Sequence, residues 1–78
     1  MFLEIVTPEE KLFAGEVKLV QLPGSKGSFE MLRNHAPIIS TLESGVIKIV
    51  TLEGKEQTFD VKGGVVEGSN NKIIVLAE

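Results

Sequence analysis

Val and Ile together make up 16 of the 78 residues, whereas Ala accounts for three. Because β-branched side chains lose rotamer freedom in a helix and fit the pleated surface of a sheet, this ratio favours strands along the whole chain. Gly and Pro interrupt the apolar runs at intervals of roughly 8–12 residues, which is typical of a sandwich or barrel. We therefore expect one all-β domain that spans residues 1–78.

Individual strands follow from the apolar runs, and the clearest covers residues 46–51. There Ile47 and Ile49 alternate with Lys48, the two-residue period of a strand with one face in water. Residues 8–13 are expected to form a turn and a short strand, since Gly15 would end a helix after barely two turns. The last run is apolar on both faces and predicts an interior strand. The other expected strands are residues 2–6, 16–22, 28–32, 38–42, 57–61, 64–67 and 73–77.

Two hairpins are expected. In the loop of residues 51–55, Gly54 supplies the positive φ that a short hairpin loop needs. In the second hairpin, Asn70 and Asn71 form a two-residue turn, because Asn tolerates the left-handed region well.

The composition excludes several kinds of site and partner. The chain has no Cys and one His, His35, so disulfides, thiolate metal sites and multi-His metal sites within one chain are ruled out. A net charge of −3 without Trp or Tyr argues against a nucleic-acid module, which carries a basic patch and stacking aromatics. No run of about 20 apolar residues predicts a membrane span. The first residues lack the features of a signal peptide, so a cytosolic protein is the default expectation.

Few residues could carry chemistry. His35 is the only candidate general base, and a nucleophilic dyad would need a Ser or Thr beside it and an orienting acid. Ser40, Thr41, Glu43 and Ser44 are near in sequence, but strand geometry scatters them over both faces. A structural or interface role for His35 is therefore favoured. Gly63-Gly64 is followed by an apparent strand, which favours a bulge or a close strand approach over a phosphate loop.

Five segments together resemble one known family. GSFEMLRNHAP at residues 27–37 is similar to the G-x-(L/F)-G-(V/I)-(L/Y)-P-(G/N)-H-A-P signature of the epsilon subunit of F-type ATP synthases. The supporting matches keep the same order and spacing over nearly the whole chain. They are LEIVTP at residues 3–8, LFAGEV at 12–17, LESGVIKI at 42–49 and VKGGVVE at 61–67.

The resemblance implies a flattened β-sandwich of about ten short strands with little or no helix. It implies a non-catalytic rotor subunit of the central stalk, which links the gamma subunit to the c-ring and couples proton flow to ATP synthesis. No cofactor, metal or nucleic acid is implied, and no ATP site is expected without the family's helical arm. The subunit would lie on the cytoplasmic side of the bacterial inner membrane, peripheral and held there through the complex.

The resemblance also assigns residue roles. Contact with the c-ring falls on Ser25, Lys26, Gly27, Ser28, Phe29 and Glu30. Contact with gamma falls on Thr7, Arg33, His35, Ala36, Pro37 and Ser40. Structural roles within the sandwich fall on Gly45, Gly63 and Gly64.

The sequence departs from the family pattern at two positions and at its end. Glu30 stands where the family usually has Gly, and Arg33 stands where it usually has Pro. These charges either contact a partner or pair with each other. Family members commonly continue into a hairpin of two helices, whereas this chain stops at Glu78. An enzyme whose native subunit ends at Glu78 is expected to lack arm-based inhibition of ATP hydrolysis.

Two other functions remain open on the residues alone. A biotinyl or lipoyl carrier module has a similar length and is all-β, and Lys55 near a hairpin tip would be the modified lysine. Its flanking residues lack the Met or Asp that usually accompanies such a lysine. A small hydrolase built on His35 is disfavoured, because the partner residues are absent.

Overall fold

The computed structural model describes all 78 residues as eight strands without a helix. The all-β prediction is therefore confirmed. There are eight strands rather than about ten, because residues 11–24 form one continuous strand where a short strand and a second strand were expected. The strands are β1 (Phe2–Val6), β2 (Lys11–Gly24), β3 (Gly27–Leu32), β4 (Ile38–Leu42), β5 (Gly45–Thr51), β6 (Glu56–Val61), β7 (Gly64–Ser69) and β8 (Lys72–Ala77).

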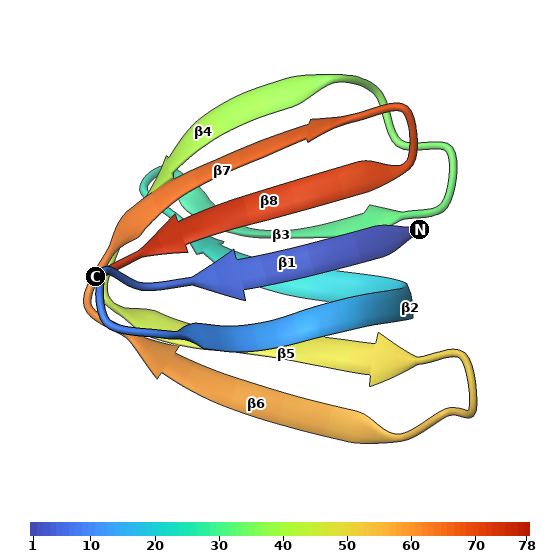
Figure 1. Cartoon of the computed structure of the whole chain (residues 1–78). Helices are drawn as coiled ribbons and strands as arrows, with labels where there is room; N and C mark the ends of the chain where they lie inside the picture. Colours follow the sequence, from blue (N-terminus) through green and yellow to red (C-terminus); the bar gives the residue numbers. More distant parts are fainter.

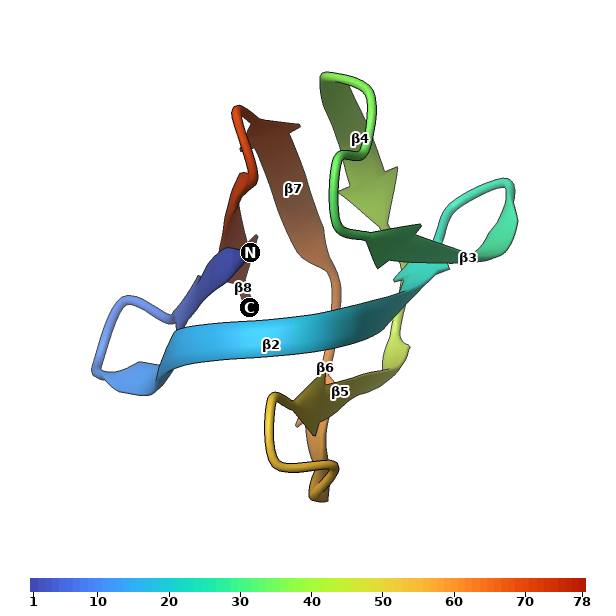
Figure 2. The same cartoon turned by 90° about the vertical axis from the view of Figure 1, so that its right-hand side faces the viewer.

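The long strand β2 joins the two layers of the sandwich. Its first part pairs antiparallel with β1, and its second part pairs antiparallel with both β3 and β5. The register shifts between Val17 and Leu19, and a bulge of this kind bends a strand. Figure 2 shows β2 crossing from the layer of β1, β8, β7 and β4 to the layer of β3, β5 and β6. Strands that switch sheets in this way form the corners of a β-sandwich.

Fifteen buried hydrophobic side chains fill the space between the layers, and no polar or charged residue is buried with them. The alternation of side chains along a strand determines which of them are buried. Ile47 and Ile49 of β5 are fully buried, while Lys48 between them faces outward. Burying each such side chain contributes about 1.5–3 kcal/mol. Hydrophobic burial is therefore the main force that holds the two layers together.

Strand β8 lies inside its layer, parallel to β1 and antiparallel to β7, so the prediction of an interior strand is confirmed. Only one of its faces enters the core. On the other face Leu76 is 57% exposed, and it pairs with Val65 of β7, which is 40% exposed. Ile39 of β4 lies on the same outer face and is 75% exposed. This outer face is therefore partly apolar.

Both predicted hairpins are confirmed. Gly54 has a φ of 89° in the loop between β5 and β6. Asn70 and Asn71 have φ values of 52° and 57° between β7 and β8. Both Asn residues therefore occupy the left-handed region that a two-residue hairpin turn requires.

The connections between strands gather at two opposite ends (Figure 1). The β2–β3 end also holds the β1–β2, β4–β5 and β6–β7 connections and the C-terminus. The β3–β4 end also holds the β5–β6 and β7–β8 connections and the N-terminus. The structure contains no helix that could span a membrane.

Candidate functional site

The turn between β2 and β3 projects Ser25 and Lys26 into solvent at the β2–β3 end. Gly27 closes the turn with a φ of 125°, a backbone conformation that residues other than Gly rarely adopt. The Ser25 backbone N–H donates to the Thr41 carbonyl oxygen at 3.1 Å. The Thr41 hydroxyl donates to the Ser25 hydroxyl at 2.9 Å. The turn is therefore tied to β4 and does not hang free.

A cleft of about 580 Å³ lies between this turn and β4. Four hydroxyl side chains line it, and we call it the hydroxyl cleft. Gln21 reaches toward one of them and donates to the Ser28 hydroxyl at 3.4 Å. The cleft can therefore exchange hydrogen bonds with a polar partner, and Lys26 is the one charged group in its lining. Its hydroxyl residues are Ser25, Ser28, Ser40 and Thr41.

Phe29 and Glu30, the remaining members of the assigned ring-contact set, face different environments. Phe29 pairs with Leu22 and packs partly buried against the core. Glu30 is exposed, pairs with Gln21 and has no positive φ. A Glu is tolerated at this position because the backbone runs extended there.

The loop of residues 33–37 lies at the β3–β4 end. Asn34 has a φ of 65° and reverses the chain after Arg33. The Asn34 backbone N–H donates to Asn71 Oδ1 at 2.6 Å, and Asn71 Nδ2 donates to Asn34 Oδ1 at 3.1 Å. We call this reciprocal pair the Asn34–Asn71 clasp. It fixes the loop to the β7–β8 turn, 37 residues away in sequence.

His35 is half-buried in the same loop, while Ala36 and Pro37 are exposed. Its Nδ1 lies 3.0 Å from the Ala36 carbonyl oxygen, and its buried Nε2 has no hydrogen-bond partner. A Cβ placed on Gly68 of β7 would lie 3.0 Å from the His35 ring. His35 is therefore packed against the sandwich, and no Ser, Thr or acid activates it. No group of three His, Asp or Glu side chains is placed to hold a metal ion.

Thr7 and Ser40 lie apart from that loop. Thr7 is in the β1–β2 turn at the β2–β3 end, where its hydroxyl accepts from the Glu10 backbone N–H at 3.1 Å. Ser40 is in the hydroxyl cleft beside the assigned ring-contact turn. The structure therefore does not bring Thr7, Ser40 and His35 to one place.

The three glycines with assigned structural roles all stand at the β2–β3 end. Gly63 and Gly64 connect β6 to β7 with φ values of 145° and 146°. A Cβ on Gly64 would clash with the Leu76 carbonyl oxygen of the adjacent strand. A Cβ on Gly45 would lie 2.8 Å from Pro23 Cβ. The backbones at Gly64 and Gly45 therefore approach their neighbours more closely than other residues permit.

Arg33 and Glu30 form no ion pair with each other, so the two departures from the family pattern are separate features. The three ion pairs of the chain are Met1 amino group–Glu16, Lys11–Glu4 and Lys48–Glu56. No functional role was predicted for Lys18 or Thr41, and Asn71 was predicted only as a turn residue. The pair Asn70-Asn71 signalled a turn, but nothing local to it indicated the partner loop.

Comparison with known proteins shows which family the chain belongs to. The family described as ATP synthase, Delta/Epsilon chain, beta-sandwich domain matches residues 1–78. The chain belongs to this family. It is 42% identical over 76 residues to the ATP synthase epsilon chain of Chlorobaculum tepidum, covering 97% of this chain and 86% of that one. It is also 42% identical over 78 residues to the epsilon chain of Campylobacter hominis, where it covers 99% of this chain but 60% of the relative.

Two solved structures show the same fold. A chain in the Euglena gracilis mitochondrial ATP synthase, in a structure of OSCP, F1 and c-ring, superposes with a TM-score of 0.90 at 17% identity. That match covers 96% of this chain and 48% of the other. A chain in the central stalk and c-ring of the Tetrahymena thermophila mitochondrial ATP synthase superposes at 0.82 with 16% identity, covering 99% and 62%.

Family membership settles the class of the protein. The epsilon-family chain is a non-catalytic subunit of ATP synthase and is not an enzyme by itself. Its relatives include epsilon chains of several bacteria. The family match also favours this class over a carrier module or a hydrolase.

Proposed function

We propose that the epsilon-family chain is a rotor component of the central stalk that links the gamma subunit to the c-ring and couples proton flow to ATP synthesis. The observation that carries the proposal is the family match over every residue of the chain. A chain of the same fold in the Tetrahymena thermophila structure of central stalk and c-ring supports the same position. The domain would sit at the cytoplasmic face of the bacterial plasma membrane, attached through its partners.

The two ends of the sandwich suggest an orientation. The β2–β3 turn and the hydroxyl cleft form a polar surface suited to the polar loops of c subunits. The loop of residues 33–37 at the opposite end is assigned to gamma. Thr7 and Ser40 lie near the ring-facing end, so a gamma subunit that contacts them as well must run along the side of the sandwich. The domain then bridges the two partners.

Purification of the complex from native membranes tests the function. A tag on the epsilon-family chain is expected to recover gamma and c subunits together, because the central stalk and the ring turn as one body. The recovered chain is expected to have the mass of the unmodified polypeptide. A biotinyl or lipoyl adduct at Lys55, with neither gamma nor c recovered, would instead support the carrier module.

Crosslinking tests the orientation. Cysteines introduced by Ser25→Cys or Ser28→Cys are expected to form disulfides with cysteines in the c-subunit loops. The contact is expected to be polar, and exposed ion pairs contribute at most about 1 kcal/mol each. Because salt screens such pairs, the crosslinking yield should fall as the salt concentration rises. Ser69→Cys, exposed at the β3–β4 end, is the matched control and should not react with the ring. Reaction of Ser69→Cys alone would show that the domain is inverted.

A further inference from the structure

The hydroxyl cleft at the β2–β3 end contains hydrogen-bond donors that have no acceptor within the epsilon-family chain. A hydroxyl group donates one hydrogen bond and accepts up to two. The Thr41 hydroxyl donates to the Ser25 hydroxyl at 2.9 Å, and the Ser40 hydroxyl donates to the Thr41 carbonyl oxygen at 3.2 Å. The proton of the Ser25 hydroxyl is left free. If the bond between Ser25 and Thr41 runs the other way, the free proton belongs to Thr41, so the pair offers one free donor in either case.

Ser28 provides the second free donor. Its hydroxyl oxygen accepts from the Gln21 side-chain amide at 3.4 Å, and its own proton has no acceptor within the chain. Ser28 and the pair of Ser25 and Thr41 all line the cleft. The cleft therefore presents two O–H donors to a ligand that enters it.

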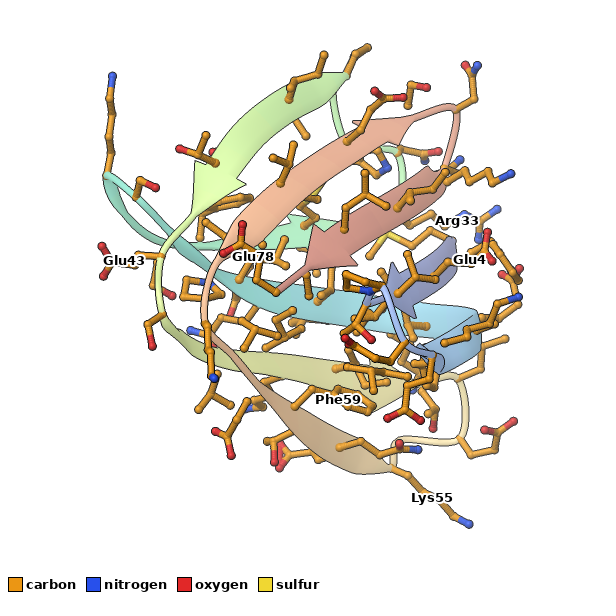
Figure 3. All side chains as sticks on the ribbon, turned by 60° about the vertical axis from the view of Figure 1, so that its left-hand side comes forward. Glu4, Arg33, Glu43, Lys55, Phe59 and Glu78 are labelled. Atoms are coloured by element: carbon orange, nitrogen blue, oxygen red, sulfur yellow. The ribbon has the colours of Figure 1, made fainter.

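Lys26 determines the charge of the cleft. It is the one charged residue of the lining, and its ammonium group forms no ion pair within the chain. Glu30 and Glu43 belong to adjoining segments, but neither lines the cleft. Figure 3 shows Glu43 projecting outward from the β4–β5 connection. A cation would be repelled by Lys26 with no acid in the lining to offset the repulsion, whereas an anion would be attracted.

The hydroxyl groups of the cleft are held in place by the fold. The Ser25 backbone N–H donates to the Thr41 carbonyl oxygen at 3.1 Å, in addition to the bond between the two hydroxyls. Ser28 lies on β3 and Thr41 on β4, and each is paired with a neighbouring strand. Groups that are fixed before a ligand arrives lose less conformational entropy on binding. The two hydroxyl donors are therefore preorganised.

We propose that the hydroxyl cleft binds a phosphate group. A phosphate has several acceptor oxygens and a negative charge, which match two O–H donors and one ammonium group, and lysine binds phosphate as a point charge. The volume of about 580 Å³ accommodates a phosphate together with bound water. Inorganic phosphate and a phospholipid headgroup both present these oxygens. The proposal is independent of the proposed function, since it requires neither gamma nor the c-ring.

Nuclear magnetic resonance of the isotope-labelled 78-residue chain tests the binding. Titration with inorganic phosphate, at an ionic strength held constant with sodium chloride, is expected to shift the backbone amide signals of residues 24–29 and 39–41. The shifts should saturate with a dissociation constant on the order of 1 mM, because the one ammonium group is exposed. Shifts that do not saturate, or that chloride alone reproduces, would overturn the proposal.

Lysine variants test the charge of the cleft. Lys26→Gln is expected to raise the dissociation constant for phosphate about fivefold, which is the most that one exposed charge contributes. Lys62→Gln is the matched control, because Lys62 is exposed at the same end but lies outside the cleft. It should change the dissociation constant less than about 1.5-fold. Equal effects of the two variants would mean that phosphate responds to net charge alone, and the cleft would be ruled out as the site.

Serine variants test the hydroxyl donors. Ser28→Ala removes one donor and should raise the dissociation constant about threefold. Ser69→Ala, at the opposite end, should leave it unchanged. Circular dichroism of all variants checks that the sandwich remains folded. If Ser28→Ala binds phosphate as tightly as Ser69→Ala, the hydroxyl donors have no role in recognition.

Vesicles distinguish the two sources of the phosphate group. If the source is a lipid, the chain should sediment with phosphatidylglycerol vesicles, inorganic phosphate should displace it, and Lys26→Gln should abolish the binding. If inorganic phosphate binds but the chain does not sediment, the ligand is the free anion. Sedimentation that neither phosphate nor Lys26→Gln weakens would overturn the lipid headgroup as the occupant of the cleft.

Discussion

Gly64→Ala is expected to lower the free energy of unfolding by roughly 3–5 kcal/mol, because backbone strain and overpacking add at this position. The φ of 146° is a conformation that alanine rarely adopts, and the added Cβ would clash with the Leu76 carbonyl oxygen. That oxygen belongs to the backbone of the adjacent strand β8 and cannot move without breaking its pairing with β7. Small domains have about 5–15 kcal/mol of total stability, so a large share would be lost.

Urea denaturation followed by circular dichroism measures this loss, since the chain has no Trp or Tyr for fluorescence. Gly27→Ala is the matched control. Its φ of 125° imposes similar backbone strain, but no atom lies within 4 Å of the added Cβ. It should cost about 1–2 kcal/mol. Equal losses in the two variants would mean that strain alone, and not the contact between strands, makes Gly64 necessary.

Local patterns in the sequence were sufficient to predict most of the strands. The alternation of Ile47, Lys48 and Ile49 placed the core face of β5 correctly. Asn70 and Asn71 located a turn to the residue, because few residues tolerate a positive φ. These features depend on a few neighbouring side chains, so a single sequence contains the information.

Features that depend on distant residues were not predictable in the same way. The strand β2 was expected as two pieces, because Gly15 looked like a break. In the structure Gly15 pairs with Leu3, and the bend comes at the bulge near Val17. The Asn34–Asn71 clasp spans 37 residues. Neither the partner strand nor the partner loop leaves a local signal.

In the candidate site, too, some features could be predicted from the sequence and others could not. The resemblance assigned contact with the c-ring to one continuous segment, but side chains alternate along a strand. Ser28 and Phe29 both line the hydroxyl cleft. Ser28 is exposed there, whereas Phe29 beside it is half-buried and packs against the core. A contiguous segment taken as one contact surface necessarily includes residues that face inward.

Removal of the Phe29 side chain is expected to have the second large effect on stability. Phe29→Ala is expected to lower the free energy of unfolding by roughly 2–3 kcal/mol, somewhat less than for a fully buried Phe. Its ring closes the edge of the sandwich beside Gly24, where an added Cβ would lie 2.7 Å from the ring. Loss of the ring leaves a cavity under the β2–β3 turn, so the turn should also become more mobile.

Leu32→Ala on the same strand is the control, because Leu32 is 53% exposed on the opposite face. It should cost less than about 1 kcal/mol, as expected for a surface position. Both variants are measured by urea denaturation, and each is combined with Ser28→Cys to follow crosslinking to the c subunits. If Phe29 acts through the fold, crosslinking recovers under conditions that stabilise the domain without adding salt, such as added sucrose. Unchanged stability with abolished crosslinking would show that the Phe29 ring itself touches the c-ring.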